Sequence, residues 1–418
     1  GADETSGMPR GGELTVDKSR NKSYMFRLQA DLNRYWGVEQ QHNINASVGM
    51  ETNSTKYDAY KNITRGYDPE RGKQFIVVDP TVYTSYANWM SENVPVVTDN
   101  LSNMLSWYGS ISYSYGNWFT VNANVRYDGS NQFGERSNDK LLPIWSASFN
   151  YNVMEHFKGE QDWFDDLRLK MSYGYQGNML DGQSPVAIIS KKPYNDHYGE
   201  YVSSITTYPN PDLKWEKTGS LNVGVEFSMF QRLMVVASYY RKKTEDAYLN
   251  KEISGVNGMT SYVVNGGEIV NSGYDFALTL NPIRKENLRW YVSTSFTHTN
   301  NEVNSLPGAD QFERMNFLNG TAVVKGKSVS SFYSYKFTGL DAKGLPMFDD
   351  MEEEQESLHG KSKYEVFTQV LEESGRREPI IFGGLNTTVN YKRWRLNAAF
   401  SYSLGAKTRL FKLYADNG

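Results

Sequence analysis

Cysteine is absent from the 418-residue chain, so neither a disulfide framework nor thiol chemistry contributes to its fold. The chain also lacks any apolar run of 18 residues, which is the length that a membrane-spanning helix needs. Basic charge shows no excess, because 44 Lys and Arg stand against 48 Asp and Glu. That balance argues against a nucleic-acid partner. The lack of a long apolar run does not exclude a membrane-spanning β-barrel, because about half of the residues in such a barrel are polar.

Catalytic and metal-binding motifs are missing as well. There is no G-x-S-x-G elbow and no P-loop, and the histidines have no H-x-x-x-H or H-E-x-x-H spacing. We therefore expect no enzyme and no cofactor. The acidic run Asp349–Glu356 is the one place where oxygen ligands could hold a structural Ca²⁺. A solvated loop is the simpler interpretation, because no Gly-punctuated calcium loop accompanies the run.

What the chain does have is a recurring two-residue alternation. Between Phe119 and Tyr127 the odd positions are apolar and the even positions carry amides, a hydroxyl and an arginine. Such alternation predicts a β-strand with one apolar and one polar face. Twelve stretches of roughly ten residues share the pattern. They lie near residues 24–32, 42–50, 107–113, 119–127, 145–153, 167–175, 221–229, 233–239, 274–280, 288–296, 385–391 and 394–402.

The length of these stretches indicates where the apolar face lies. Ten residues rise about 33 Å, and a tilt near 45° leaves about 24 Å of height, close to the apolar band of an outer-membrane barrel. A strand of an ordinary sandwich is nearer five or six residues. We therefore expect an all-β fold, an antiparallel transmembrane β-barrel with about twelve strands in this chain. Apolar side chains such as Val121 face lipid, and charged ones such as Arg126 face the lumen.

The connections alternate between short turns and long loops. Turns at Gly116, Gln231 and Lys392 join partners of a pair, whereas the pairs themselves are mostly separated by long segments. Outer-membrane barrels place such long loops outside the cell and the short turns in the periplasm. We expect a leading loop at 1–22, barrel strands across 23–405 and the start of a further loop at 406–418. The long extracellular loops are expected near 52–104, 177–217, 244–272 and 301–383, and the last includes the strand-like segment 329–348.

Five sequence motifs carry a resemblance. They are "NVRYDGSNQFG" (124–134), "LRLKMSYGYQGN" (167–178), "NPDLKWEKTGSLNVGVEF" (210–227), "VNGGEIVNSGYDFALTL" (264–280) and "GLDAKGLPMF" (339–348). In this order they resemble motifs of the SusC/RagA-like TonB-dependent outer-membrane transporters. The departures are small: Met171 and Tyr175 replace usual residues, and Asp275 stands where Glu is commoner.

The resemblance implies a barrel of 22 strands with an N-terminal plug, in the outer membrane of a Gram-negative bacterium. Its members work with a SusD-like surface lipoprotein that acts as a lid, and with the TonB complex that acts on the plug. Nothing here matches the plug, the TonB box or the closing strands, and the chain has no initiator Met or signal sequence. The chain therefore resembles the middle-to-late part of such a barrel.

The function implied is TonB-dependent active import of oligosaccharides or other large nutrients. Import of peptides by a member of the same family is an alternative, and a passive porin or an adhesin barrel is another. A secreted β-propeller or sandwich that binds or hydrolyses carbohydrate would need shorter strands than these. The expected partners are the lipoprotein, the TonB complex, the substrate and outer-membrane lipid, with no nucleic acid.

Six residues are candidates for substrate contact. Arg126 and Asp128 lie on the polar face of a strand, where they contact substrate or, alternatively, brace and hydrate the wall. Aromatic residues on the long loops are suited to stacking on sugar rings or to contact with a partner, although mutual packing within the loop explains them equally well. These aromatic residues are Trp89, Tyr194, Tyr198 and Tyr201.

Overall fold

The computed structural model describes most of the chain. The described residues are 11–70, 72–77, 79, 81–131, 141–157, 164–178, 187–195, 197–210, 214–252, 261–306, 312–349 and 355–409. Within them, no helix combines the length and the apolar character that crossing a bilayer requires.

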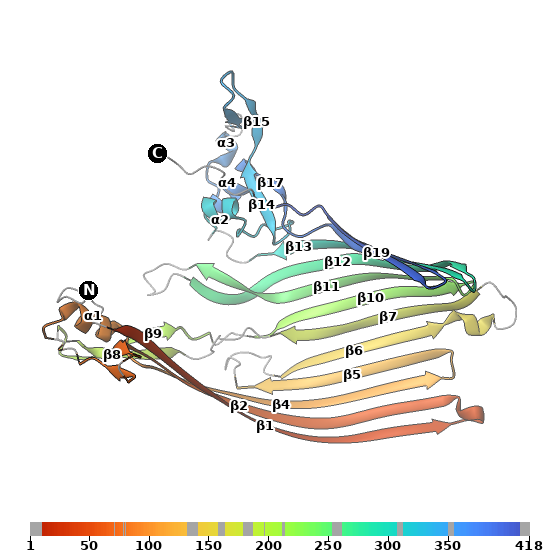
Figure 1. Cartoon of the computed structure of the whole chain (residues 1–418), viewed down its shortest axis with the longest axis horizontal. Coiled ribbons are helices and arrows are strands. Elements are labelled where there is room, and N and C mark those ends of the chain that lie inside the picture. The colour runs from red at the N-terminus through yellow and green to blue at the C-terminus, as the bar shows by residue number, and fades with distance from the viewer. Residues whose placement is uncertain are drawn as a thin grey trace. The chain divides into compact units, whose positions relative to one another are not determined.

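One large sheet contains all twelve of the predicted strands (Figure 1). Each strand is hydrogen-bonded to the strands that precede and follow it in the order below, and a short strand, β3 (Gln74–Phe75), pairs with β2. The order is β1 (Gly12–Trp36), β2 (His42–Asp68), β4 (Val96–Tyr115), β5 (Phe119–Ser130), β6 (Leu141–Asn152), β7 (Phe164–Asn178), β10 (Glu216–Met229), β11 (Leu233–Glu252), β12 (Ser261–Arg284), β13 (Leu288–Ser305), β18 (Ile381–Tyr391) and β19 (Trp394–Leu404).

The register places apolar side chains opposite one another. Met171 on β7 lies opposite Phe149 on β6 and Val223 on β10, so three strands continue one apolar row. Two residues along, Leu169 lies between Tyr151 and Val225 in the same way. Because a slip of one residue would put every one of these side chains on the other face, the alternation fixes the register.

The last hairpin has the predicted pairing, with Tyr391 opposite Trp394. Its turn residue Lys392 has a φ of 53°, in the region that tight hairpin turns require. The turns at the same end of the sheet also contact one another. Gly116 N–H donates to Gln41 O at 2.6 Å, and Lys392 N–H donates to Asn287 O at 2.9 Å. The prediction that the short turns gather at one end is therefore confirmed.

Several strands are longer than the alternation predicts. β1 begins at Gly12, so the assignment of 1–22 as a loop is wrong from Gly12 onward. β2 runs to Asp68 and β4 starts at Val96, which shortens the loop expected at 52–104. β11 ends at Glu252 and β12 starts at Ser261, which shortens the one expected at 244–272. The reason is that backbone pairing does not need alternation, and beyond the apolar band polar residues occupy both faces.

The long loops contain structure that the alternation did not predict. Strands β8 (Ile188–Asn195) and β9 (Glu200–Thr207) form a hairpin, and α1 (Thr84–Glu92) lies between β3 and β4. The segment 329–348 lies outside the main sheet, as expected. There β14 (Ser331–Tyr335) pairs with β17 (Leu371–Arg376), and β15 (Phe337–Leu340) pairs with β16 (Pro346–Phe348).

A small hydrophobic core holds together the described residues of the segment 312–376, which we call the insert. It adds helices α2 (Arg314–Asn319), α3 (Gln355–Leu358) and α4 (Lys363–Val370) to strands β14–β17. Its core combines side chains from helices α2 and α4 and from both strands of the β14–β17 pair. The core residues are Phe317, Ala322, Val324, Tyr333 and Leu371, with Phe312, Leu318, Tyr335, Tyr364 and Phe367 packed around them.

Candidate functional site: the polar face of the sheet

The polar face of the sheet is tied together by side chains of neighbouring strands. Asn122 on β5 donates from Nδ2 to Ser148 Oγ on β6 at 3.1 Å, and Asn124 donates to Ser146 at 3.3 Å. Ser114 and Thr120 share a hydrogen bond at 2.9 Å between β4 and β5. The face is thus a wall of amides and hydroxyls, groups that both donate and accept hydrogen bonds.

Several charged groups on this face are paired across or along the strands. Lys170 on β7 bonds Glu226 on β10, and Arg168 Nε lies 2.8 Å from Asp166 Oδ2. Both basic side chains lie on the polar face, and so do their carboxylate partners. Arg168 and Lys170 keep 44% and 50% of their side-chain surface exposed, so each pair contributes little to stability.

Arg126 and Asp128, both predicted as site residues, lie together on β5. Arg126 Nε is 2.6 Å from Asp128 Oδ1, and the Asp128 residue is only 7% exposed. The Arg126 guanidinium carbon lies 5.9 Å from the centroid of the Tyr108 ring, and Tyr108 OH donates to Gln29 Oε1 at 2.7 Å. This geometry favours bracing of the wall, because Asp128 is directed at Arg126 and has little exposed surface.

Trp89 lies on α1 and has an arginine on its ring. Arg65 Cζ is 4.0 Å from the ring centroid, a cation–π distance, and Tyr86 stacks at 6.0 Å. Arg65 is also bonded through Nε to Glu13 at 3.1 Å. These contacts favour packing within the loop region over stacking on a sugar.

The three tyrosines of the β8–β9 hairpin are placed differently. Tyr194 lies opposite Tyr201 in the register, and Tyr198 lies in the turn between them. Tyr198 and Tyr201 are each 69% exposed, and the Tyr198 ring contacts His197 edge-on at 5.1 Å between centroids. The two-stranded hairpin therefore presents two aromatic rings to solvent. The side chain of Tyr194 lies outside what the structure describes.

The acidic run at 349–356 is only partly within the described residues, since 350–354 lie outside them. Asp349 pairs with Lys336 at 2.7 Å. In the described parts of the chain, no three His, Asp or Glu side chains gather in a way that could hold a metal ion. A calcium ion in this loop therefore stays a prediction.

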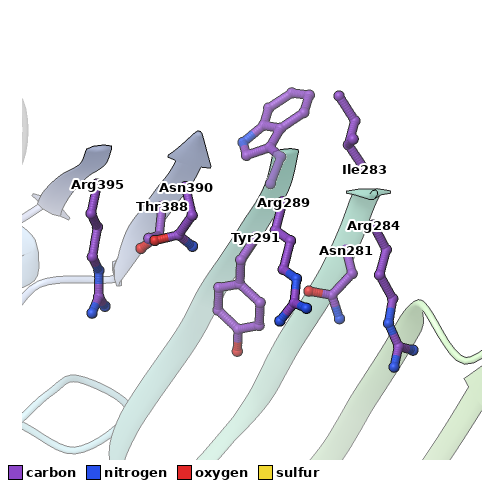
Figure 2. Close-up of a pocket in the computed structure, with 9 residues that line it drawn as sticks. Asn281, Ile283, Arg284, Arg289, Tyr291, Thr388, Asn390 and Arg395 are labelled. Carbon is purple, nitrogen blue, oxygen red and sulfur yellow. The ribbon is translucent and has the colours of Figure 1, made fainter. Parts of the chain in front are cut away.

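Sequence reasoning missed a pocket of about 400 Å³ near the turns that join β12 to β13 and β18 to β19 (Figure 2). Three arginines line it, together with Asn, Thr and Tyr side chains. The sequence signal that could have revealed the pocket is a change in the alternation of apolar and polar residues. In the structure, a bulge at Asn281 and Pro282 shifts the register between Leu280 and Ile283. Its lining residues are Asn281, Ile283, Arg284, Arg289, Trp290, Tyr291, Thr388, Asn390 and Arg395.

Comparison with families of known proteins gives one match that spans nearly the whole chain. The model of the TonB-dependent receptor-like β-barrel matches residues 4–417. The chain belongs to this family. It is therefore a membrane-spanning part of an outer-membrane protein, with the apolar face of its sheet toward lipid and the polar face toward the lumen.

Curated relatives include a TonB-dependent receptor of Formosa agariphila, which is 30% identical over 250 residues, 58% of this chain and 23% of the relative. The TonB-dependent receptor SusC of Bacteroides thetaiotaomicron is 25% identical over 336 residues, 75% of this chain and 32% of SusC. The chain thus spans less than a third of either relative. The match to SusC places it beside the SusC/RagA-like transporters that its motifs resemble.

Solved structures show the same fold. The RagAB peptide importer in its closed-closed state has a TM-score of 0.75 at 22% identity, over 94% of this chain and 42% of that one. The open-open state of RagAB gives 0.73 at 21% identity over the same shares. The described sheet is therefore part of a barrel of this type.

Proposed function

We propose that the full-length protein imports oligosaccharides across the outer membrane, driven by TonB, with a SusD-like lipoprotein as its lid. The observation that carries the proposal is the wall of paired amides and hydroxyls, in a chain of this family. Asn122–Ser148 and Asn124–Ser146 present oxygen and nitrogen atoms that match sugar hydroxyl groups without adding net charge. This uncharged, hydrogen-bonding part of the wall is suited to neutral, hydroxyl-rich cargo.

The exposed tyrosines support the same substrate class. Tyr198 and Tyr201 offer exposed, flat apolar faces on a two-stranded hairpin, and such rings stack on the apolar faces of sugars. The proposal assigns them first contact with substrate. Arg126 and Asp128 serve as structural supports of the wall in this scheme, and Trp89 serves the packing of α1 against Arg65.

A peptide substrate is the second candidate. RagAB, whose structures are compared above, is a peptide importer, and amide-rich walls also match peptide groups. A porin or adhesin function has no specific observation in its favour.

Uptake in cells tests the substrate class. A strain lacking the gene is complemented with the full-length gene, and growth is measured on defined oligosaccharides or peptides as the sole carbon source. We expect rescue on oligosaccharides. Rescue on peptides alone would overturn the glycan proposal, and rescue that persists without TonB would overturn active import.

Substitution of the hairpin tyrosines tests the contact. Tyr198→Ala combined with Tyr201→Ala should raise the oligosaccharide concentration for half-maximal growth about fivefold, since a lost ring contact costs about 1 kcal/mol. Phe337→Ala is the matched control, because Phe337 is an exposed aromatic side chain on another two-stranded hairpin. An equal effect of both would remove the hairpin from the proposal.

The orientation follows from the short turns. Cysteines placed at Gln231 and Lys392 should resist an impermeant thiol reagent on intact cells, and one at Tyr198 should react, because the proposal puts the turns in the periplasm. The native chain has no cysteine, so the background is low. The reverse labelling pattern would invert the orientation.

A further inference from the structure

Three basic residues follow one another on one face of strand β1, beyond the end of its apolar row. They are Lys18, Arg20 and Lys22, at every second position directly before Tyr24. β1 is an edge strand of the large sheet (Figure 1), and its even positions from Tyr24 to Leu32 are apolar. We call Lys18, Arg20 and Lys22 the basic stripe.

Side-chain contacts on both sides of the basic stripe show which face it occupies. Arg65 Nε of β2 donates to Glu13 Oε2 at 3.1 Å. Further along β1, Arg27 pairs with Glu51 of β2. Both contacts use odd positions of β1, so the odd positions stay on the polar face over the whole stretch between them. The basic stripe has even positions and therefore lies on the outward face, in line with the apolar row.

The length of β1 places the basic stripe at the level of the lipid headgroups. Twelve residues separate Tyr24 from Trp36 at the short-turn end, which gives about 40 Å along the strand and about 28 Å of height at a tilt near 45°. An apolar band with aromatic residues at both edges is about 25 Å tall. Lys22 lies about 5 Å beyond Tyr24 in height, and Lys18 about 14 Å. Because short turns of such barrels are periplasmic, the basic stripe lies in the outer leaflet.

The carboxylates level with the basic stripe on the next strands contact another lysine. The pairs of β1 with β2 described above put Asp58 level with Arg20. Asp58 Oδ1, however, lies 3.3 Å from Lys56 Nζ, and Asp99 Oδ2 on β4 lies 3.1 Å from the same nitrogen. With the stripe, this part of the outward face has four basic residues and two acidic ones, so positive charge is in excess.

Another outward-facing lysine shows how such a charge is usually compensated. Lys243 on β11 continues the outward row of Tyr239, and it bonds Glu245 at 2.7 Å and Glu268 at 3.0 Å. None of the three stripe residues makes an ion pair with any of the described residues. Like charges two residues apart on one face of a strand are about 7 Å apart and repel one another. Anions from outside the described residues would relieve this repulsion.

We propose that the basic stripe binds the phosphate groups of a phosphorylated lipid of the outer leaflet. The acyl chains of this lipid lie on the apolar row below the stripe, where Tyr24, Phe26 and Leu28 are 70%, 57% and 61% exposed in the isolated chain. Arg20 makes paired N–H contacts to phosphate oxygens, and the two lysines add compact positive charges. A site with a cationic part directly above an apolar part distinguishes a lipid from a free phosphate ion.

A strand from outside the described residues is the other candidate occupant, because β1 has a free edge in this chain. Such a strand would need carboxylates on its outward face at the level of the basic stripe. These carboxylates would repel the phosphate groups of the surrounding headgroups, whereas the basic stripe attracts them. The apolar row directly below the stripe also matches a lipid and is not explained by a carboxylate partner. We therefore favour the lipid.

Native mass spectrometry of the full-length, detergent-purified protein tests the proposal. Lys18, Arg20 and Lys22 are changed to Gln together, and lipid A is titrated into the delipidated protein. We expect the wild type to bind lipid A at least tenfold more tightly than the triple variant, because each basic residue near anionic headgroups contributes about fivefold. The wild type should also prefer lipid A to the same lipid without its phosphates.

Two further variants keep the test specific. Lys243→Gln is the matched control and should leave lipid A binding unchanged, because Lys243 already has carboxylate partners. Lys18→Arg combined with Lys22→Arg keeps the charges and should retain binding. If heat modifiability shows that the triple variant does not assemble, Arg20→Gln is measured alone. We then expect a loss of about fivefold, and no loss would overturn the proposal.

Three other results would also overturn it. The first is equal binding of lipid A by the wild type and the triple variant. The second is equal binding of lipid A with and without phosphates, or its full displacement by inorganic phosphate, because the apolar row would then add nothing. The third is a carbodiimide cross-link from Lys18 or Lys22 to a carboxylate of the same protein, which would identify a neighbouring strand as the occupant. No oligosaccharide enters the measurement, so its outcome is independent of the proposed function.

Discussion

The large sheet and the insert stabilise their apolar side chains in opposite ways. On β5, Val121 is 40% exposed in the isolated chain, on a face that meets lipid. In the insert, Phe317 is 0% exposed and its ring contacts Tyr333 and Phe367. The sheet needs the bilayer as its apolar environment, whereas the insert supplies its own. Both regions have aromatic and aliphatic residues in similar amounts, so composition alone does not separate them.

The comparison shows which kinds of substitution should destabilise each region. A polar change on the outward face of the sheet is costly because lipid cannot solvate it. A truncation in the core of the insert is costly because it leaves a cavity. The same Phe or Val therefore carries different risks in the two regions, and the four predictions below separate them.

The largest effect is expected for Phe317→Ala. Loss of a fully buried ring costs about 3–5 kcal/mol, enough to unfold a segment as small as the insert. Limited proteolysis of outer membranes should then cleave within 312–376 while the barrel stays assembled. Phe337→Ala, at an exposed ring of the same segment, serves as control and should leave the cleavage pattern unchanged. Loss of the whole barrel would show that the insert is needed for assembly.

Val121→Arg should have the next largest effect. An arginine on the lipid face near the bilayer centre costs about 2–4 kcal/mol. Asn122→Arg changes the adjacent residue on the polar face and loses one hydrogen bond, to Ser148. The amount of heat-modifiable, folded protein in outer membranes should fall strongly for the first variant and little for the second. Equal tolerance of the two would contradict the assignment of the faces.

Asp128→Asn should have a smaller effect, within the polar face. Removal of the carboxylate charge leaves Arg126 without its 2.6 Å partner, at a cost of about 1–3 kcal/mol. The midpoint of heat modification should fall accordingly. Asp349→Asn removes a carboxylate from the exposed Lys336 pair, where the expected loss is below about 1 kcal/mol. If the two losses are alike, Asp128 does not brace the wall.

The smallest effect concerns pH and the insert. Burial raises the pKa of Glu373, but hydrogen bonds from Lys327 and Ser331 outweigh it and hold the pKa below the usual 4.5. The carboxylate therefore stabilises the insert fully above about pH 4.5, and this contribution is lost as the pH falls through the lowered pKa. Proteolysis of the insert should increase over that range. Glu373→Gln should flatten the pH dependence of proteolysis. If the variant and the wild type show the same pH dependence, Glu373 is not its cause.

Much of the sheet could be predicted from the sequence, because alternation reports directly which residues face lipid. The pairing of Tyr391 with Trp394 could be predicted from two features alone. These are the odd or even numbering of the apolar positions in each strand and the length of the turn. The extensions of β1, β2, β11 and β12 could not be predicted in this way. Beyond the apolar band no single face is buried, so the residue pattern loses its period while the backbone ladder continues.

The site was less predictable than the fold. Arg126 and Asp128 are two apart on a strand, so the sequence placed them side by side, and the structure adds their contact. The pocket between the turns brings together Arg284 and Arg395, which no local sequence pattern connects. Trp89 was chosen as an aromatic residue on a loop, and only the fold shows Arg65 on its ring. Direct contact of Arg126, Asp128 or Trp89 with substrate stays a prediction.

The backbone bonds between neighbouring turns have a consequence for hydrogen exchange at this end of the sheet. Asn152 N–H donates to Trp118 O at 2.8 Å, and Asn281 N–H donates to Arg232 O at 2.8 Å, so these hairpins are also joined to a neighbouring hairpin at their tips. We expect such amides to exchange with solvent slowly although they lie beside turns, because opening one tip also breaks its bond to the neighbouring hairpin.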